Sequence, residues 1–257
     1  MTTRLHRREY KFLIDERTAD RIRSLIDGYC EVDENAVATG GRYLCDTLYF
    51  DSHHYAIYKA TIANAARRYK VRVRGYPMAP SAPVFLEVKR RIDETIVKTR
   101  ARLTGDWAAQ LDSGTLDHLG DRDRLAFENF LSHYLAAPCG LLVPKVLVRY
   151  EREPFAGRVD HYARVTFDRD IRFQQHAELS MESRAPWTQI DDSTSMWPEL
   201  GSMVVLELKF LAEAPPRWMR LMVERLELRR VAYCKYTRAI DSMLRRPTAR
   251  RSKLASL

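Results

Sequence analysis

The seven residues Arg68-Tyr-Lys-Val-Arg-Val-Arg74 alternate strictly between basic side chains and apolar or aromatic ones. Successive side chains of a β-strand point to opposite faces, so the alternation predicts a strand with four cations on one face. The four cations are Arg68, Lys70, Arg72 and Arg74. Tyr69 is expected on the opposite, apolar face.

Two further segments repeat this pattern. In Phe85-Leu-Glu-Val-Lys-Arg-Arg91 the residues Glu87, Lys89 and Arg91 are in phase. The next segment, Lys98-Thr-Arg-Ala-Arg102, again has a basic residue at every second position. Like charges that face one another across neighbouring strands destabilise a sheet. Three successive cationic strands therefore indicate an anionic ligand, and a polyphosphate is the first candidate. The in-phase cations of the third strand are Lys98, Arg100 and Arg102.

Hydrophobic periodicity and turn residues predict the remaining elements. Strands are expected at 5–14, 42–51, 68–74, 85–91, 94–103, 142–153, 163–173 and 203–210. Helices are expected at 16–29, 55–63, just after Thr104 and Asp106, 121–136, 217–228 and 235–244. Asp15 is the expected N-cap of the first helix. The prolines at 77, 80 and 83 indicate a hairpin-type break, and the polar stretch 174–202 an excursion loop.

Charged residues alternate along most of these strands, which bears on how the sheet is arranged. A solvated face explains any single strand, but a sheet with this many strands must curl or close. Closure with the charged face inward gives a tunnel lined by Arg and Lys, which suits a linear polyanion. We therefore predict an α+β fold, an antiparallel β-barrel tunnel with peripheral helices. Residues 1–244 would form one domain and 245–257 a flexible basic tail.

Three glutamates lie in phase with the cations and are candidate metal ligands: Glu9, Glu87 and Glu207. Mg²⁺ or Mn²⁺ is usually held by one or two carboxylates together with phosphate oxygens. For Glu9 and Glu87, pairing with an Arg or Lys of a neighbouring strand is an equally good interpretation. Glu207 lies on an otherwise apolar strand, which favours metal ligation.

Charge and motifs narrow the function classes. The net charge is +9, but five basic residues and no acidic ones fall within 245–257, which leaves +4 for the rest. A nucleic-acid surface would need a more basic body, and single-strand binding would need aromatic residues on the cationic face. The four cysteines form no metal cluster, and no phosphate-binding glycine loop or hydrolase motif is present. Cys234 is expected to be a small buried side chain. With neither a signal peptide nor an apolar run of about 18 residues, the sequence predicts a cytoplasmic protein without a transmembrane segment.

The strand motifs, in their order, resemble the VTC domain, the polyphosphate polymerase domain of the vacuolar transporter chaperone family within the triphosphate tunnel metalloenzyme superfamily. The resemblance spans about residues 7–240. It rests on Arg8-Glu-Tyr-Lys-Phe12, Lys70-Val-Arg-Val-Arg-Gly-Tyr76, Leu86-Glu-Val-Lys-Arg90, Val97-Lys-Thr-Arg100, Val148-Arg-Tyr-Glu-Arg-Glu153, Arg164-Val-Thr-Phe-Asp168, Val205-Leu-Glu-Leu-Lys-Phe210 and Tyr233-Cys-Lys-Tyr236.

The resemblance implies a tunnel in which basic residues and a metal bind a nucleoside triphosphate. By matching position it implies these phosphate-binding residues: Lys11, Arg72, Arg74, Lys89, Lys98, Tyr150, Arg152, Arg164 and Lys235. We expect Arg72, Arg74, Lys89, Arg152 and Arg164 to be catalytic, with Lys70, Arg100 and Lys209 as further substrate contacts. Glu207 would be the metal ligand. The sequence departs from the family pattern at Cys234, where eukaryotic members have Ser, and at Ala232, where they have Lys. Arg229 or Arg230 is a possible substitute for that lysine.

The leading functional hypothesis is a metal-dependent polyphosphate polymerase that transfers the terminal phosphoryl group of ATP to a growing polyphosphate chain. Its expected partners are ATP or another nucleoside triphosphate, polyphosphate and Mn²⁺ or Mg²⁺, with no specific nucleic acid. The alternatives are a tunnel triphosphatase and a non-catalytic module that binds polyphosphate or inositol polyphosphate. For the basic tail, weak contact with an anionic membrane and simple solvation both remain open.

Overall fold

The computed structural model describes residues 8–77, 82–92, 95–114, 119–135, 137–160, 162–190, 203–211 and 214–245. The strands are β1 (Arg8–Ile14), β2 (Cys30–Val32), β3 (Tyr43–Asp51), β4 (Arg67–Gly75), β5 (Val84–Ile92), β6 (Thr95–Leu103), β7 (Val143–Gly157), β8 (Arg164–Gln175), β9 (Thr188–Gln189) and β10 (Val204–Phe210). The helices are α1 (Glu16–Ile26), α2 (Glu34–Val37), α3 (Ala56–Ile62), α4 (Trp107–Ser113), α5 (Asp121–Leu135), α6 (Arg217–Arg225) and α7 (Lys235–Arg245).

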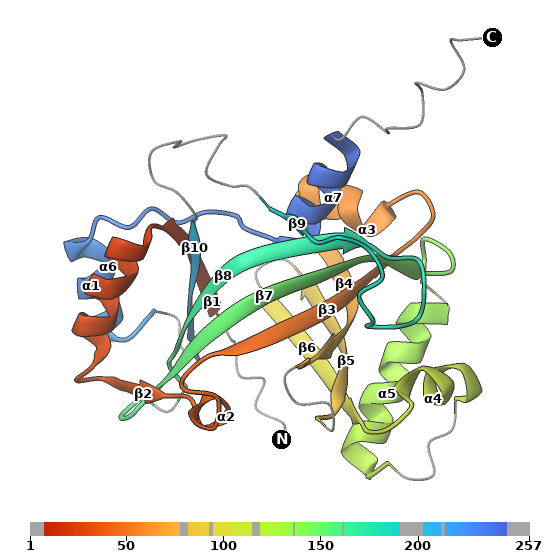
Figure 1. The fold of residues 1–257 in the computed structure, drawn as a ribbon, viewed down its shortest axis with the longest axis horizontal. Helices are drawn as coiled ribbons and strands as arrows, with labels where there is room; N and C mark the ends of the chain where they lie inside the picture. The colour runs from red at the N-terminus through yellow and green to blue at the C-terminus, as the bar shows by residue number, and fades with distance from the viewer. Residues whose placement is uncertain are drawn as a thin grey trace.

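The strands form one antiparallel sheet in the order β1-β10-β8-β7-β3-β4-β5-β6, with β2 added to β7 and β9 to β8. Figure 1 shows β8, β7 and β3 crossing the front of the molecule and β4, β5 and β6 behind them. Within the described residues no ladder joins the two edge strands, β1 and β6. An ion pair of 3.0 Å between Glu9 and Lys89 nevertheless spans from β1 to β5. The sheet therefore curls into an open, tunnel-like fold, which confirms the predicted fold class.

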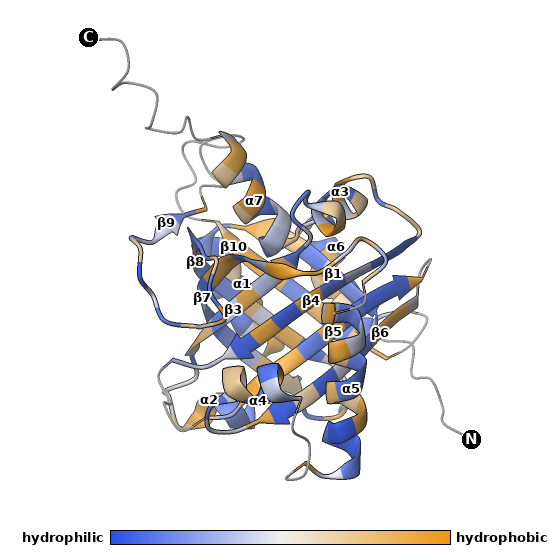
Figure 2. Ribbon diagram, turned by 90° about the vertical axis from the view of Figure 1, so that its right-hand side faces the viewer, coloured by the Kyte–Doolittle hydropathy of each residue, from blue (hydrophilic) through white to orange (hydrophobic). Residues whose placement is uncertain are grey.

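On most strands apolar side chains alternate with polar or charged ones, visible as alternating colours along the strands in Figure 2. On β4, Val71 and Val73 are fully buried against the core that contains Phe127 and Phe130 of α5. Helices α1 and α6 bury a second core over β1, β8 and β10. Because helices cover these apolar faces, the basic faces of β4, β5 and β6 are left to line the inside of the curl.

The predicted elements are present, with differences in their ends. The first helix ends at Ile26 instead of 29, and the helix expected at 217–228 ends at Arg225. Strand β7 continues past Pro154 to Gly157, and β8 runs to Gln175, where the excursion loop was expected to have begun. Three short elements were not predicted: β2, α2 and β9. The N-cap prediction is confirmed, since the Asp15 carboxylate accepts a hydrogen bond of 2.7 Å from the Thr18 amide.

Several predictions fall on residues outside the described ranges. These are the strand start before Arg8, Pro80, most of the loop after 190, and the tail beyond Arg245. Among the helices that are described, none has both the length and the apolar character needed to cross a bilayer.

Candidate anion-binding tunnel

Ten of the basic side chains on the concave charged face of the sheet and at the adjoining start of α7 form a group that we call the tunnel face. Cross-strand register places them in phase: Lys70 pairs with Lys89 and Lys89 with Lys98, while Glu87 lies between Arg72 and Arg100. The ten are Lys11, Lys70, Arg72, Arg74, Lys89, Lys98, Arg100, Arg152, Lys209 and Lys235. The structure thus brings together residues from β1, β4, β5, β6, β7, β10 and α7 that sequence analysis assigned to phosphate binding.

Glu87 is fully buried at the centre of one group of these cations. Its Oε2 lies 2.6 Å from Arg72 Nη2, and its Oε1 lies 2.5 Å from Lys98 Nζ and 3.3 Å from Arg100 Nε. Burial raises the pKa of Glu87, but Arg72, Arg74 and Lys98 lower it more, to well below its ordinary value. This carboxylate is therefore ionised and balances part of the charge on β4 and β6.

Glu207 is the centre of a second group. Its oxygens lie 2.6 Å from Lys209 Nζ, 3.2 Å from Lys11 Nζ, 3.3 Å from Arg152 Nη2 and 3.7 Å from Lys235 Nζ. Burial raises the pKa of Glu207, and these four cations lower it well below its usual range. Three of these four cations also pair with a second carboxylate: Lys11 with Glu9, and Arg152 and Lys235 with Asp168.

Asp168 is a third buried carboxylate among these cations, and sequence analysis did not assign it to the site. It is fully buried, and its carboxylate accepts 2.6 and 2.7 Å hydrogen bonds from Arg152 and one of 2.5 Å from Lys235. Burial raises the pKa of Asp168, but Arg152 and Lys235 lower it below its ordinary value. The available signal was its phase with Arg164 and Thr166 within the predicted strand.

The tunnel face carries a large excess of positive charge. Against the ten cations stand four carboxylates in the described residues, which leaves an excess of six: these are Glu9, Glu87, Asp168 and Glu207. Arg74 is only 8% exposed, and its Nε is buried without a hydrogen-bond partner. Among the described residues neither Arg74 nor Lys70 has an ion-pair partner. A buried N–H donor without a hydrogen-bond partner, such as the Arg74 Nε, is costly in the free protein, and an added anion would satisfy it.

Burial among other cations also lowers the pKa values of two lysines on the tunnel face. Burial lowers the pKa of Lys98 to about 7, with Arg72 and Arg74 acting in the same direction and Glu87 only partly opposing them. Burial likewise lowers the pKa of Lys209 to about 8, although Glu207 opposes the change. An anion bound at the tunnel face would favour the protonated form of both.

Two of the predicted phosphate-binding residues lie differently from the rest. Arg164, at the start of β8, has a side chain 37% exposed and pairs with Asp33 at 2.8 Å, so it lies at one end of the tunnel face. Tyr150 is almost fully buried, with Lys235 Nζ 4.6 Å and Arg152 Cζ 5.2 Å from its ring centroid. The Tyr150 ring therefore makes cation–π contacts with Lys235 and Arg152.

Cys234, directly before α7, is partly exposed and near two tunnel lysines. Burial raises the pKa of its thiol, but Lys70, the Thr237 amide and Lys11 together lower it below the ordinary value. Cys234 therefore places a group able to carry negative charge beside Lys70 and Lys11.

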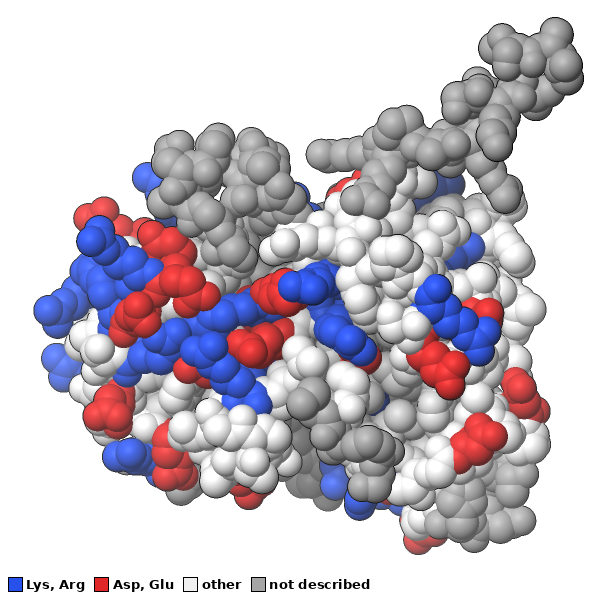
Figure 3. All heavy atoms as spheres, viewed as in Figure 1, with Lys and Arg blue, Asp and Glu red and all other residues white. Residues whose placement is uncertain are grey.

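The outer face of β7 and β8 is also rich in charge, but its charges are balanced. Figure 3 shows basic and acidic side chains interspersed across this side of the molecule. Arg149 makes two 2.7 Å hydrogen bonds with Asp46, and Arg169 pairs with Glu16 at 2.6 Å and with Glu153 at 2.8 Å. Such pairing distinguishes this surface from the tunnel face, where cations exceed carboxylates.

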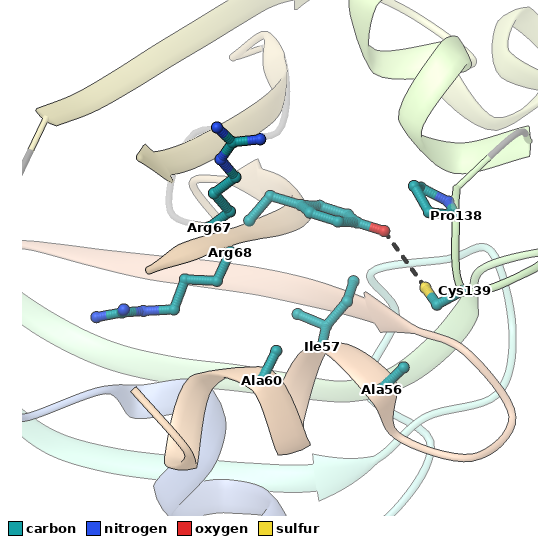
Figure 4. Close-up of a pocket in the computed structure, with 8 residues that line it drawn as sticks. Ala56, Ile57, Ala60, Arg67, Arg68, Pro138 and Cys139 are labelled. Atoms are coloured by element: carbon teal, nitrogen blue, oxygen red, sulfur yellow. Dashed lines mark hydrogen bonds between the residues drawn. The ribbon is translucent and has the colours of Figure 1, made fainter. Parts of the chain in front are cut away.

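A separate cavity of about 210 Å³ lies between α3 and the start of β4. Tyr69 and Cys139 both line it, and a 3.3 Å hydrogen bond joins the Tyr69 hydroxyl to the Cys139 sulfur, drawn as the dashed line at Cys139 in Figure 4. Its walls are largely apolar, from α3 and Pro138, with Arg67 and Arg68 beside them. Tyr69 thus lies away from the tunnel face, as predicted, and none of the assigned phosphate-binding residues lines this cavity.

Comparison with known families agrees with the strand motifs. A family model described as "VTC domain" matches residues 6–244. The chain belongs to the VTC domain family. Membership in this family relates the protein to polyphosphate. One similar solved structure, that of the PH1819 protein from Pyrococcus horikoshii OT3, has a TM-score of 0.47 and 12% sequence identity, covering 92% of this chain and 99% of that one. No curated protein matches the chain.

The VTC domain's carboxylates can be compared with the needs of a divalent metal. No group of three or more His, Cys, Asp or Glu side chains in the described residues could hold a metal ion alone. Glu9 and Glu207, however, flank one ammonium group, with Lys11 Nζ 3.1 Å from the former and 3.2 Å from the latter. Mg²⁺ or Mn²⁺ is usually held by one or two carboxylates together with phosphate oxygens. Glu9 and Glu207, which now share the Lys11 ammonium group, fit this requirement. Among the described residues, Glu87 shares none of its cations with a second carboxylate, so its predicted metal role has less support.

Proposed function

We propose that this VTC domain is a metal-dependent polyphosphate polymerase that takes the terminal phosphoryl group of ATP and adds it to a growing polyphosphate chain on the tunnel face. The observation that carries the proposal is Arg74. Arg74 is buried, in phase with Arg72 and opposite Phe85; its Nε has no hydrogen-bond partner, and within the described residues it forms no ion pair. Successive phosphates of a linear chain would supply the missing negative charge.

The arrangement suits phosphoryl transfer because that reaction needs positioning and charge neutralisation more than covalent chemistry from the protein. Arg72, Arg74 and Arg152 present forked donors to phosphate oxygens, while lysines supply point charges. Cations fixed before the reaction begins can stabilise charge in the transition state without reorganising. A curled sheet lined along several strands also holds donor and acceptor in line.

A metal ion would be held by Glu207 with Glu9. When bound with phosphate, such an ion supplies Lewis-acid neutralisation of the phosphate oxygens. Release of Lys11 from these two carboxylates would free its ammonium group for a phosphate. Burial raises the pKa values of both glutamates, but the surrounding cations lower them by more than this. The cations therefore keep both carboxylates ionised.

The proposal is tested by incubating the purified protein with ATP and Mn²⁺ or Mg²⁺ and resolving the products by gel electrophoresis. Long polyphosphate chains are expected, and Arg152→Met should reduce their formation strongly. As a matched control, Arg149→Met removes an arginine from the adjacent outward position on β7 and should leave specific activity unchanged in the folded fraction. Orthophosphate as the sole product would identify a triphosphatase. Tight binding of polyphosphate without turnover would identify a binding module.

A further inference from the structure

Three aromatic side chains form a cluster at one end of the tunnel face. Tyr43 begins β3, Tyr76 follows β4, and Phe85 is near the start of β5. The ring centroids of Tyr43 and Tyr76 are 5.5 Å apart and those of Tyr76 and Phe85 are 6.1 Å apart, both in edge-to-face arrangements. All three rings are half-buried, so part of each remains accessible to solvent.

The aromatic cluster directly adjoins the phosphate-binding arginines. Phe85 is the cross-strand partner of Arg74, and Tyr43 is the cross-strand partner of Arg152. Directly opposed side chains on one face of a sheet have Cβ atoms about 5 Å apart. A ligand whose phosphates contact Arg74 and Arg152 would therefore place its next chemical group at these rings.

Arg100 shows that the cluster accepts a flat, delocalised group. Its guanidinium carbon lies 3.4 Å from the Phe85 ring centroid, and Arg100 also donates a 3.2 Å hydrogen bond to the Tyr76 hydroxyl. The Arg100 side chain is 39% exposed and also pairs with Glu87. A planar cation beside aromatic rings at this end offers a surface on which a further planar ring can stack.

We propose that the aromatic cluster of Tyr43, Tyr76 and Phe85, with Arg100, binds the base of a nucleoside triphosphate whose phosphates extend inward along the tunnel face. This inference rests on the proposed function and adds the site that distinguishes a nucleotide from inorganic polyphosphate. Recognition by stacking accepts any base, because every base has a π-face. Purine nucleotides should bind better than pyrimidine nucleotides because their rings are larger.

The cluster accommodates one base and not a nucleic-acid strand. Further along the tunnel face, Tyr49 and Tyr150 are also aromatic, but they are 4% and 1% exposed. Arg72 lies over the first ring and Lys235 over the second. Neither ring can take a second base, so the interior remains available for phosphates.

Calorimetry with two ligands tests the inference: tripolyphosphate and a non-hydrolysable ATP analogue, each titrated into the wild-type protein, Tyr76→Ala and Tyr76→Phe. A stacked base contributes enough that Tyr76→Ala should weaken binding of the ATP analogue by roughly 5- to 150-fold. Its affinity for tripolyphosphate should stay within about twofold, since all tunnel-face cations are kept and only the Arg100 hydrogen bond to the Tyr76 hydroxyl is lost; Tyr76→Phe removes the same hydrogen bond and so controls for it. Tyr76→Phe keeps the ring and should bind both ligands like the wild type.

Other results would overturn the inference in separable ways. If Tyr76→Ala and Phe85→Leu both bind the ATP analogue as tightly as the wild type does, the base does not stack at this cluster. An equal loss for both ligands would show that Tyr76 supports the tunnel instead of contacting a base. If the wild-type protein binds neither ligand, the proposed function fails together with the inference.

Discussion

Replacing Arg74 by Met should stabilise the free protein and weaken its binding of polyphosphate. Met fills similar space without charge, and Arg74 is 8% exposed with an unpaired Nε. Its cross-strand neighbours offer no carboxylate: Thr47 lies opposite on β3, with a hydroxyl that is itself buried without a partner, and Phe85 lies opposite on β5. Glu87 is already shared among Arg72, Lys98 and Arg100.

The magnitude follows from the cost of an unsatisfied buried group. Leaving such a donor unpaired costs about 1–3 kcal/mol, so Arg74→Met should raise the free energy of unfolding by about that amount. For a domain of this size, Tm rises by roughly 2–4 °C for each kcal/mol. In the complex the same arginine should make a charge-assisted hydrogen bond worth about 1.5–3 kcal/mol. The variant should therefore bind tripolyphosphate roughly 10- to 150-fold more weakly.

Thermal unfolding with and without tripolyphosphate, together with calorimetry, measures both effects. Arg149→Met is the matched control, because it removes an arginine that is paired with the buried Asp46 on the outer face. Breaking that pair should lower the free energy of unfolding by up to about 3–5 kcal/mol and leave the affinity unchanged. A free Arg74→Met protein that is less stable than the wild type would refute the reasoning, since it would show that the protein itself satisfies Arg74.

Three further substitutions follow from contacts of the tunnel face. Tyr236→Phe removes the 2.5 Å hydrogen bond to Asp51, so chemical denaturation should show a loss of about 1.5–3 kcal/mol; an unchanged midpoint would contradict this. Because Lys98 has a lowered pKa of about 7, anion binding should take up protons and strengthen as pH falls from 9 to 7. Calorimetry should show a flatter profile for Lys98→Arg, and equal slopes would exclude Lys98 as the source. Asp168→Asn breaks two buried ion pairs and should destabilise the protein by about 3–5 kcal/mol, with a larger gain in Tm than the wild type on adding tripolyphosphate. A smaller gain in Tm would argue against the idea that uncompensated positive charge on the tunnel face lowers the stability of the free protein.

The sequence predicted the tunnel face because alternation is a direct consequence of strand geometry. Arg72, Glu87 and Arg100 could be assigned to one face from their phase alone, and the structure places them in contact. The ends of elements were less predictable. The strand expected at 142–153 continues past Pro154 as β7, and the Pro154 carbonyl accepts a hydrogen bond from the Asp33 amide.

Contacts between distant segments were beyond the reach of sequence patterns. The partners of Asp168 come from β7 and α7, and no local spacing signals that a single acid on β8 joins them. Tyr43, Tyr76 and Phe85 come from separate strands, and each taken alone is an ordinary core residue. Arg74 was assigned from its phase, but its lack of a partner depends on where every nearby carboxylate lies.

The most direct test of the account is a crystal structure of the protein with a non-hydrolysable ATP analogue and Mn²⁺. We expect the phosphates to lie along the tunnel face, with Arg74 and Arg152 in contact with their oxygens and the metal at Glu207. Phosphates bound instead on the outer face of β7 and β8, or at Arg67 and Arg68 beside the separate cavity, would contradict it.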